Sequence, residues 1–262
     1  MRMAKTARAA IIDLQASRLA AEDIVCVRGE KNLEGIAGKK AWLKERMAEG
    51  LKLKVLKVNG RSWGMIEYLP AENAWRPVDA AGYTFIECLW VIGRYKSHGF
   101  GQKLLAHCAE DSKGKNGLVV VTSAKPFLAG KDFFLRNGFE VCDTAPPYYE
   151  LLVKRHKKSA PAPKFRERAK KMLGPERSGL TFFYSDQCPY VAQSLKEMTA
   201  LARKRRIPFQ LIKIKSKKDA QNLPVAYGTF GIFLDGQFLT HQPCYGKAFD
   251  QLLSSPQKSW RQ

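Results

Sequence analysis

One stretch of the sequence joins an apolar strand pattern, a glycine-containing turn and a helical pattern, and it restricts the fold more than any other. Residues 84–92 are strongly apolar and predict a buried strand. Residues 101–111 place Leu and Cys at helical spacing, which predicts a helix. Between them, Gly99 and Gly101 let the backbone turn tightly and bring its N–H groups close to a ligand. A helix that starts in this way offers unpaired donors and the positive end of its dipole to an anion.

The side chains of the turn strengthen this interpretation. Lys96, His98 and Lys103 add positive charge or hydrogen-bond donors beside the two glycines. In physical terms the segment therefore predicts a pyrophosphate-binding site.

A basic, proline-containing stretch divides the chain. Residues 156–178 contain an Ala-Pro-Ala-Pro run followed by many charged residues, and we interpret them as a linker between two domains. For the first domain, residues 1–155, the order of strand and helix patterns predicts an α/β (α+β) fold with a mixed, mostly antiparallel sheet flanked by helices. For the second domain, residues 179–262, the pattern predicts a smaller βαβαββα fold of the thioredoxin or glutaredoxin kind.

Within the first domain the pattern also locates individual elements. We expect a strand over residues 23–28, a helix over residues 34–49 and a hairpin over residues 51–69 that turns at Asn59-Gly60. No apolar run reaches the length of about 18 residues that a membrane span requires, and no signal peptide is apparent. We therefore expect a cytoplasmic protein without a membrane partner.

Charge and metal-ligand spacing limit the possible partners. The formal net charge of +21 over 262 residues favours anionic partners. Nucleic acid is one possibility, but no reader motif supports it. The six Cys and four His residues have no metal-ligand spacing, so no metal site is expected.

Two motifs of the first domain resemble the acetyl-CoA motifs of the GNAT superfamily. The usual form of the first is Arg or Gln, two residues and then Gly-x-Gly/Ala, and residues 96–101 match it with Lys96 in the first place. The second commonly ends in Gly-Phe, as residues 134–139 do. The resemblance covers residues 23–155. It implies an acyltransferase, an acetyl-CoA-dependent N-acetyltransferase that moves the acetyl group to an unidentified amine by direct attack on the thioester.

The resemblance also implies which residues hold the cofactor. The N–H groups of Val91 and Gly93 would bond the pantetheine arm, and the turn would hold the pyrophosphate. Lys96 offers only a point charge where the family prefers Arg or Gln. The expected cofactor-binding residues are Val91, Ile92, Gly93, Lys96, Ser97, His98, Gly99, Phe100, Gly101, Gln102 and Lys103.

The sequence departs from the family where the leaving thiolate must be protonated. Phe134 stands where many relatives have a Tyr that gives this proton, and Phe127 aligns with a frequent Asn. A phenyl ring cannot donate a proton, so we take Tyr148 and Tyr149 as substitute catalytic residues. The alternative is that both tyrosines only pack in a strand.

Glu87 is the candidate general base. It lies in the apolar strand that leads to the cofactor turn, where a carboxylate must be paired or face a cleft. Glu67 is a weaker alternative, and a structural, salt-bridged Glu87 is the competing interpretation. Residues 68–83 would wall the acceptor pocket or form a long connection.

The second domain resembles a degenerate glutaredoxin. Cys188-Pro189-Tyr190-Val191 is similar to the Cys-Pro-Tyr-Cys active-site turn, with Val191 in place of the second cysteine. Gly228 occupies the position at which the family has a cis-proline. The overall layout is similar to the YoaP-like acetyltransferases of bacteria.

Two other functions stay open beside acyl transfer. Cys188, the redox candidate, would support a monothiol redox protein if its thiol were acidic. The third possibility is a non-catalytic, cofactor-regulated binding protein for an anionic partner.

Overall fold

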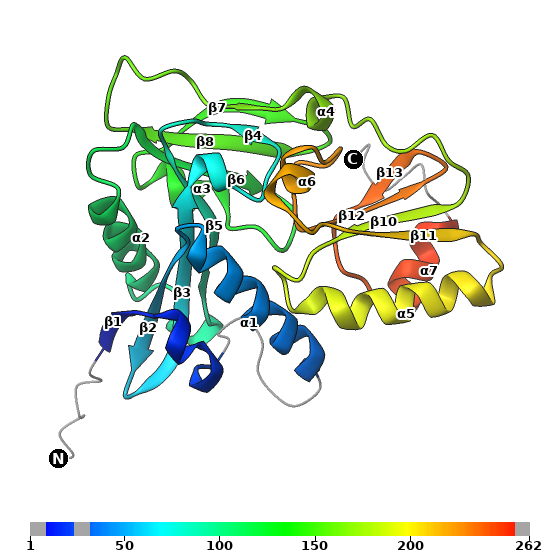
Figure 1. Ribbon diagram of the computed structural model, residues 1–262, viewed down its shortest axis with the longest axis horizontal. Coiled ribbons are helices and arrows are strands. Elements are labelled where there is room, and N and C mark those ends of the chain that lie inside the picture. Colours follow the sequence, from blue (N-terminus) through cyan, green and yellow to red (C-terminus); the bar gives the residue numbers. More distant parts are fainter. Residues whose placement is uncertain (1–8, 24–31, 255–262) are drawn as a thin grey trace.

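The computed structural model describes residues 9–23 and 32–254, and Figure 1 shows two sheets side by side with helices packed on them. The strands are β1 (Ala9–Asp13), β2 (Lys52–Val58), β3 (Arg61–Pro70), β4 (Val78–Asp79), β5 (Thr84–Val91), β6 (Gly117–Ser123), β7 (Glu140–Ala145), β8 (Tyr149–Arg155), β9 (Lys164–Phe165), β10 (Leu180–Tyr184), β11 (Phe209–Lys213), β12 (Phe230–Leu234) and β13 (Gln237–Thr240). The α-helices are α1 (Leu33–Ala48), α2 (Phe100–Asp111), α3 (Lys131–Leu135), α4 (Glu167–Lys170), α5 (Tyr190–Lys204), α6 (Lys217–Gln221) and α7 (Gly246–Ser254).

The larger sheet has seven strands in the order β1-β2-β3-β5-β6-β8-β7. Every neighbouring pair is antiparallel except β5 and β6, which run parallel. The hairpin of β2 and β3 turns at Asn59 and Gly60, which both have positive φ, as a type I′ turn requires. This sheet confirms the predicted mixed, mostly antiparallel fold. The strand expected over residues 23–28 lies outside the described residues, apart from Asp23.

Each face of the large sheet has its own core. On one face Leu104, Leu105 and Cys108 of α2 pack with Phe134 of α3. On the other face α1 contributes Trp42 and Leu43 to a larger core. That second core continues without a break into the buried side chains of the smaller sheet. The two sheets are therefore held together by shared apolar packing as well as by the chain.

The smaller sheet has the order β11-β10-β12-β13. Strands β10 and β11 are parallel, and the remaining pairs are antiparallel. Together with α5, α6 and α7 these strands follow the predicted βαβαββα order. The thioredoxin-like prediction for the second fold is thereby confirmed.

The stretch interpreted as a linker has structure of its own. Strand β9 pairs with β4 of the first part, and α4 follows it directly. Phe165 and Ala169 are fully buried. The basic run thus lies against the first part, and the division at residues 156–178 stays a prediction.

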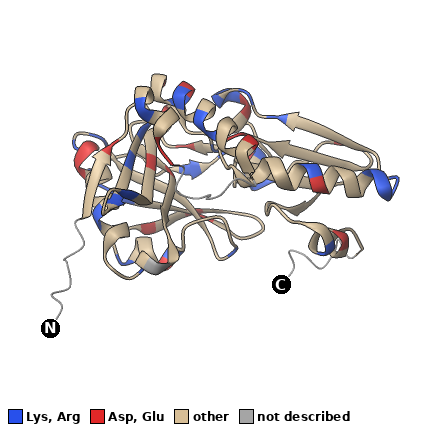
Figure 2. Cartoon of the chain, turned by 90° about the horizontal axis from the view of Figure 1, so that it is seen from below, with Lys and Arg blue, Asp and Glu red and all other residues tan. Residues whose placement is uncertain are grey.

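The charged side chains are spread over both parts of the molecule. Figure 2 shows Lys and Arg on helices and strands of both parts, with Asp and Glu among them. Many of the cations are paired, as Lys213 is with Asp186 and Arg205 with Asp250. Over the described ranges, no helix is both long enough and apolar enough to cross a bilayer.

Candidate active site

Strands β5 and β6 pair over only part of their length. Their parallel ladder joins Thr84–Ile86 to 118–120 and then ends, although β5 continues to Val91 and β6 to Ser123. Beyond that point the strands diverge, and a cavity of about 50 Å³ lies there. The residues around it come from both strands, from the segment before β4, from the segment that leads into α3 and from α3 itself: Arg76, Phe85, Ile86, Glu87, Cys88, Leu89, Trp90, Val120, Val121, Phe127, Leu128, Ala129 and Phe134.

The open edge of β5 leads from this cavity to the glycine turn. The N–H of Ile92 donates to the carbonyl oxygen of Trp63, 2.9 Å away in β3. Because successive N–H groups of a strand point to opposite edges, the N–H of Val91 points away from β3 and toward the unpaired edge. A cofactor arm placed along that edge finds a main-chain donor there. Ile92 and Gly93 lie at the end of the strand, where a short 3-10 turn begins.

The glycine turn itself is exposed and opens the helix α2. Gly99 is the N-cap residue with φ of 73°, a left-handed conformation, and an added Cβ would meet nothing within 4 Å. The first helical bond runs from the N–H of Lys103 to the carbonyl of Gly99, at 3.0 Å. The N–H groups before it therefore have no acceptor within the helix. Main-chain donors meet open space here, as an anion site requires.

The other predicted residues of the turn lie around these amides. Lys96, Ser97, His98, Gln102 and Lys103 are exposed, and Phe100 and Gly101 are half-buried. Ser97 has φ of 64°, so the side chain at a position that often holds glycine is accommodated in a left-handed backbone. The Nδ1 of His98 lies 2.8 Å from the carbonyl oxygen of Lys96, which shapes the loop.

Glu87 is placed at the cavity but is fully engaged. A β-bulge in the β3–β5 ladder makes Glu87 the extra residue of its strand, and its side chain is completely buried. One carboxylate oxygen accepts the N–H of Trp75 at 2.7 Å. The other lies 3.0 Å from Nη1 of Arg76 and accepts Nε2 of Gln187 at 2.9 Å. The carboxylate is therefore held as a paired structural group, which favours the competing interpretation of Glu87 over the general base.

Glu67, the weaker base candidate, has a similar environment. It is fully buried and forms an ion pair with Lys39 at 2.7 Å. Burial raises the pKa of Glu67, and Lys39 opposes that effect. Lys39 comes from α1, so this pair ties the helix to β3.

Tyr148 and Tyr149 lie together where the two parts of the chain meet. The hydroxyl of Tyr148 is 2.8 Å from Nδ1 of His241, and Nε2 of His241 is 3.0 Å from the carbonyl oxygen of Pro126. A carbonyl only accepts, so Nε2 carries the proton, and Tyr148 donates to Nδ1. Burial raises the pKa of Tyr148 to about 12 and lowers the pKa of His241 to about 4.

Tyr149 is less accessible than Tyr148. Its ring is fully buried between the rings of Tyr148 and His241. Burial holds the pKa of Tyr149 well above its usual range. The burial and ring contacts of Tyr149 favour the alternative that it packs in the strand.

Phe127 and Phe134 both line the cavity between the diverging strands. The resemblance placed them at the positions of an Asn and a proton-donating Tyr, and both rings are indeed beside the open edge of β5. Phe127 has φ of 73° and packs edge-on against Tyr190 of α5, with the ring centroids 6.1 Å apart. Helix α5 of the second part thus contributes a side chain that supports the cavity wall.

Cys188 lies between the two parts, at a groove of about 480 Å³ between α1 and α5. Burial is the largest influence on its thiol and raises the pKa, while the N–H of Tyr190 opposes this effect. A reactive monothiol requires the opposite shift. Cys244 is also a free thiol, and its Sγ bonds the carbonyl of Gln242 at 3.0 Å.

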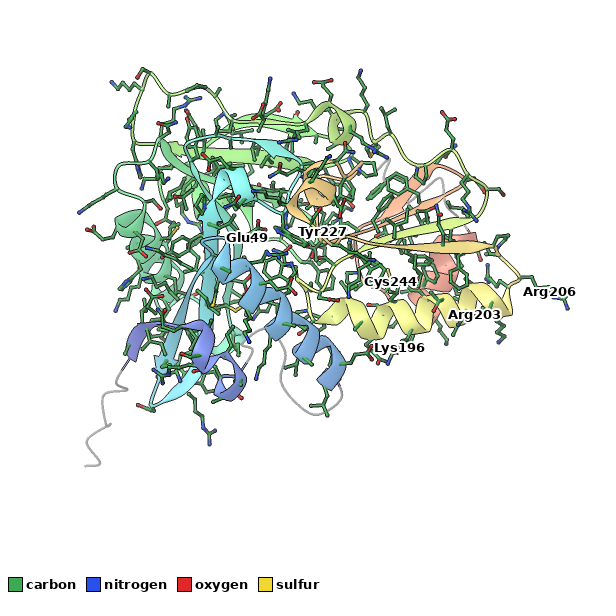
Figure 3. The ribbon with its side chains drawn as sticks, viewed as in Figure 1. Glu49, Lys196, Arg203, Arg206, Tyr227 and Cys244 are labelled. Atoms are coloured by element: carbon green, nitrogen blue, oxygen red, sulfur yellow. The ribbon has the colours of Figure 1, made fainter. Side chains whose placement is uncertain are left out.

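Sequence reasoning did not identify three residues that matter here: Arg76, Gln187 and His241. Arg76 appeared only as part of a possible pocket wall. Gln187 stands beside the noticed Cys188, and His241 follows β13 without any motif around it. Each is buried and polar, and each bonds a partner in the other part of the chain. Figure 3 shows their neighbour Tyr227 between the two parts.

Comparison with known proteins gives matches to both parts. Residues 28–139 match a model described as the acetyltransferase (GNAT) family, and residues 208–251 match one described as YoaP-like. The chain is 35% identical over 249 residues to the N-acetyltransferase YoaP of Bacillus subtilis (strain 168). That alignment spans 93% of this chain and 98% of the relative.

Solved structures match somewhat more than half of the chain. A PaiA N-acetyltransferase from Thermoplasma acidophilum, in complex with coenzyme A, has 17% identity and a TM-score of 0.44, covering 57% of this chain and 99% of that one. A ribosomal-protein-alanine N-acetyltransferase from Brucella melitensis has 19% identity and a TM-score of 0.43, covering 56% and 99%.

Proposed function

Because this chain belongs to the GNAT N-acetyltransferases that carry a YoaP-like C-terminal part, we propose that it acetylates an amine in the cleft between β5 and β6. Family membership confirms the predicted enzyme class and acetyl-CoA as the co-substrate. The site of binding, the roles of single residues and the acceptor amine belong to the proposal.

The divergence of β5 from β6 is the observation that best supports this proposed function. The β5–β6 ladder ends at Ile86 and Val120, although both strands continue beyond these residues. The pantetheine arm, which carries amide groups, can pair with this edge as a strand would. At one end of the edge stands the exposed glycine turn, and at the other stands the small cavity.

The pyrophosphate is assigned to the start of α2. The N–H groups of residues 99–102 supply donors, and the helix dipole adds positive potential. Lys96 and Lys103 contribute charge at the rim of this site. Val91 contributes the donor at the pantetheine.

The chemistry is one nucleophilic substitution at the thioester carbonyl. The neutral amine forms a C–N bond, the C–S bond breaks, and the amine gives up a proton while the CoA thiolate takes one. Burial keeps both tyrosines protonated at neutral pH, and Tyr148 is preferred as the proton donor because its side chain is the more accessible of the two. Glu87 has no free carboxylate edge in this arrangement, so the amine proton passes to water.

Thermal unfolding with acetyl-CoA tests the binding site. Millimolar acetyl-CoA should raise the Tm of the wild type, because a ligand of the folded state stabilises it. At Gly93 an added Cβ meets nothing within 4 Å, so Gly93→Trp should fold and block the cleft, which would abolish the shift. The matched control is Lys113→Trp, which adds the same ring to an exposed position beyond the far end of α2. A wild type that shows no shift would refute the proposed site.

Release of CoA across pools of amines then tests the reaction. An enzyme releases CoA faster with one pool than with none. Binding without any amine-dependent release would instead favour the non-catalytic binding protein.

A further inference from the structure

One buried polar side chain of the C-terminal part, Gln187, bonds two residues that line the cavity between β5 and β6. Gln187 precedes Cys188 in the loop between β10 and α5, and its side chain is turned toward the first part of the molecule. It is 4% exposed. All three of its side-chain hydrogen-bond partners are buried polar groups.

Both the nitrogen and the oxygen of the Gln187 side-chain amide form hydrogen bonds. Its Nε2 donates to Glu87 at 2.9 Å, and its Oε1 accepts Nη1 of Arg76 at 2.7 Å and the hydroxyl of Thr229 at 2.9 Å. A primary amide carries both a donor and an acceptor, so one side chain can hold a carboxylate and a guanidinium at once. A carboxylate in this place would face Glu87 with like charge, and an apolar side chain would leave buried polar atoms unpaired.

Arg76 and Glu87 both line the cavity where β5 and β6 diverge. Arg76 is 3% exposed, and its Nη2 makes one long bond of 3.4 Å to the carbonyl of Glu87. Since Nη2 carries two hydrogens, the guanidinium keeps donor capacity at a cavity of about 50 Å³. That volume suits a group as small as acetyl, and a guanidinium beside it attracts a carbonyl oxygen.

We propose that Gln187 is a positioning residue for acetyl transfer, through which the C-terminal part holds the Arg76–Glu87 pair at the acyl end of the cleft. This inference rests on the proposed function. In this role the thioredoxin-like part positions residues of the acetyl site and uses no thiol chemistry. The acetyl group of the donor is what this pair recognises, whereas the glycine turn recognises the rest of CoA.

The test compares the binding of acetyl-CoA with that of CoA, measured by calorimetry on the full chain. Both ligands use the glycine turn, so the ratio of their Kd values reports the acetyl end alone. In Gln187→Glu the new carboxylate repels Glu87 and shifts Arg76, so the ratio should change about tenfold in favour of CoA, the size of one hydrogen bond to a charged group. The affinity for CoA itself should stay within about twofold of the wild type.

A swap variant and a control separate positioning from general damage. Glu87→Gln with Gln187→Glu restores one amide and one carboxylate across the same contact, so the ratio should return toward the wild-type value. Gln193→Glu makes the same charge change on the exposed face of α5, next to Glu197, and should leave the ratio unchanged. If Gln187→Glu does not fold, Thr229→Val removes one bond to Gln187 without adding charge and should change the ratio in the same direction.

The outcomes distinguish the two proposals. A wild type that binds neither ligand refutes the proposed function. A wild type that binds both, with variants at Gln187 or Thr229 that leave the ratio unchanged or weaken both ligands equally, refutes the positioning role alone.

Discussion

Acid should destabilise this protein through one buried histidine. His241 has no exposed surface, and it is wedged between the ring of Tyr227 and the rings of the two adjacent tyrosines. Its two nitrogens are both used, one accepting from Tyr148 and the other donating to Pro126. A second proton on the ring would remove the acceptor for Tyr148 and bury a charge beside Lys125.

The magnitude follows from the displacement of the pKa. Burial lowers the pKa of His241 from 6.5 to about 4, so between these values the unfolded chain binds a proton that the folded chain does not. The stabilisation is complete above pH 6.5 and is lost as the pH falls toward 4. At 1.36 kcal/mol per pH unit, the total loss is about 3 kcal/mol, of which about 2 kcal/mol falls between pH 7 and pH 5.

Urea unfolding followed by tryptophan fluorescence at pH 7, 6 and 5 measures this loss. The reference is His241→Gln, whose amide can accept from Tyr148 and donate to Pro126 without titrating. The wild type should lose about 2 kcal/mol more than this variant between pH 7 and pH 5. His107→Gln, at an exposed position of α2, should behave as the wild type does. A difference between wild type and His241→Gln that stays constant with pH would show that this histidine is not held neutral.

Three further results are expected. Gly228→Ala should lower the free energy of unfolding in urea by at least about 2 kcal/mol, because Gly228 has φ of 75° and its added Cβ would lie 2.4 Å from Cδ of Arg76. Gly130→Ala, at a position with an ordinary φ and open space, should lower it far less. Equal losses in the two variants would contradict the close packing at Gly228. Tyr148→Phe should cost about 1–3 kcal/mol by leaving Nδ1 of His241 without its donor, and should slow CoA release; release at the wild-type rate would assign the thiolate proton to water. Alkylation of Cys188 should titrate with a midpoint above the usual value of about 8.5, and an acidic midpoint would restore the monothiol hypothesis.

Local patterns were sufficient to predict most of the elements. The order of the second sheet and its helices follows from apolar runs, the turn at Asp235-Gly236 and the helix after Pro189, all of which act over a few residues. The glycine turn was equally visible, since an N-cap with positive φ has few sequence solutions. Strand β1 was missed because Ala9–Asp13 has a short, weak pattern and becomes a strand only by pairing with β2.

The chemistry of the cleft was harder to predict because it depends on distant residues. Glu87 was conspicuous as a carboxylate in an apolar strand, but its ion-pair partner Arg76 is 11 positions away and Gln187 is 100 positions away. No pattern of single-sequence spacing encodes such a contact. Tyr148 is a candidate because of its place in the strand order, whereas its partner His241 is 93 positions away and directly follows β13. The sequence therefore predicts a separate second domain, whereas polar side chains of that domain bond buried polar groups of the first.

The features that make the second part a poor redox protein are those that fit it to the first. A proline at position 228 cannot adopt the φ of 75° found there, and any Cβ would meet the carbonyl of Trp75 at 2.5 Å and Arg76 at 2.4 Å. In the loop between β10 and α5, which carries Gln187, the carbonyl of Pro189 would lie 2.1 Å from an added Cβ at Gly35 of α1. Both this loop and the loop before β12 therefore pack closely against the first part of the chain. The same close packing buries Cys188 and raises the pKa of its thiol, so the contacts that hold the second part against the first also disfavour thiol chemistry.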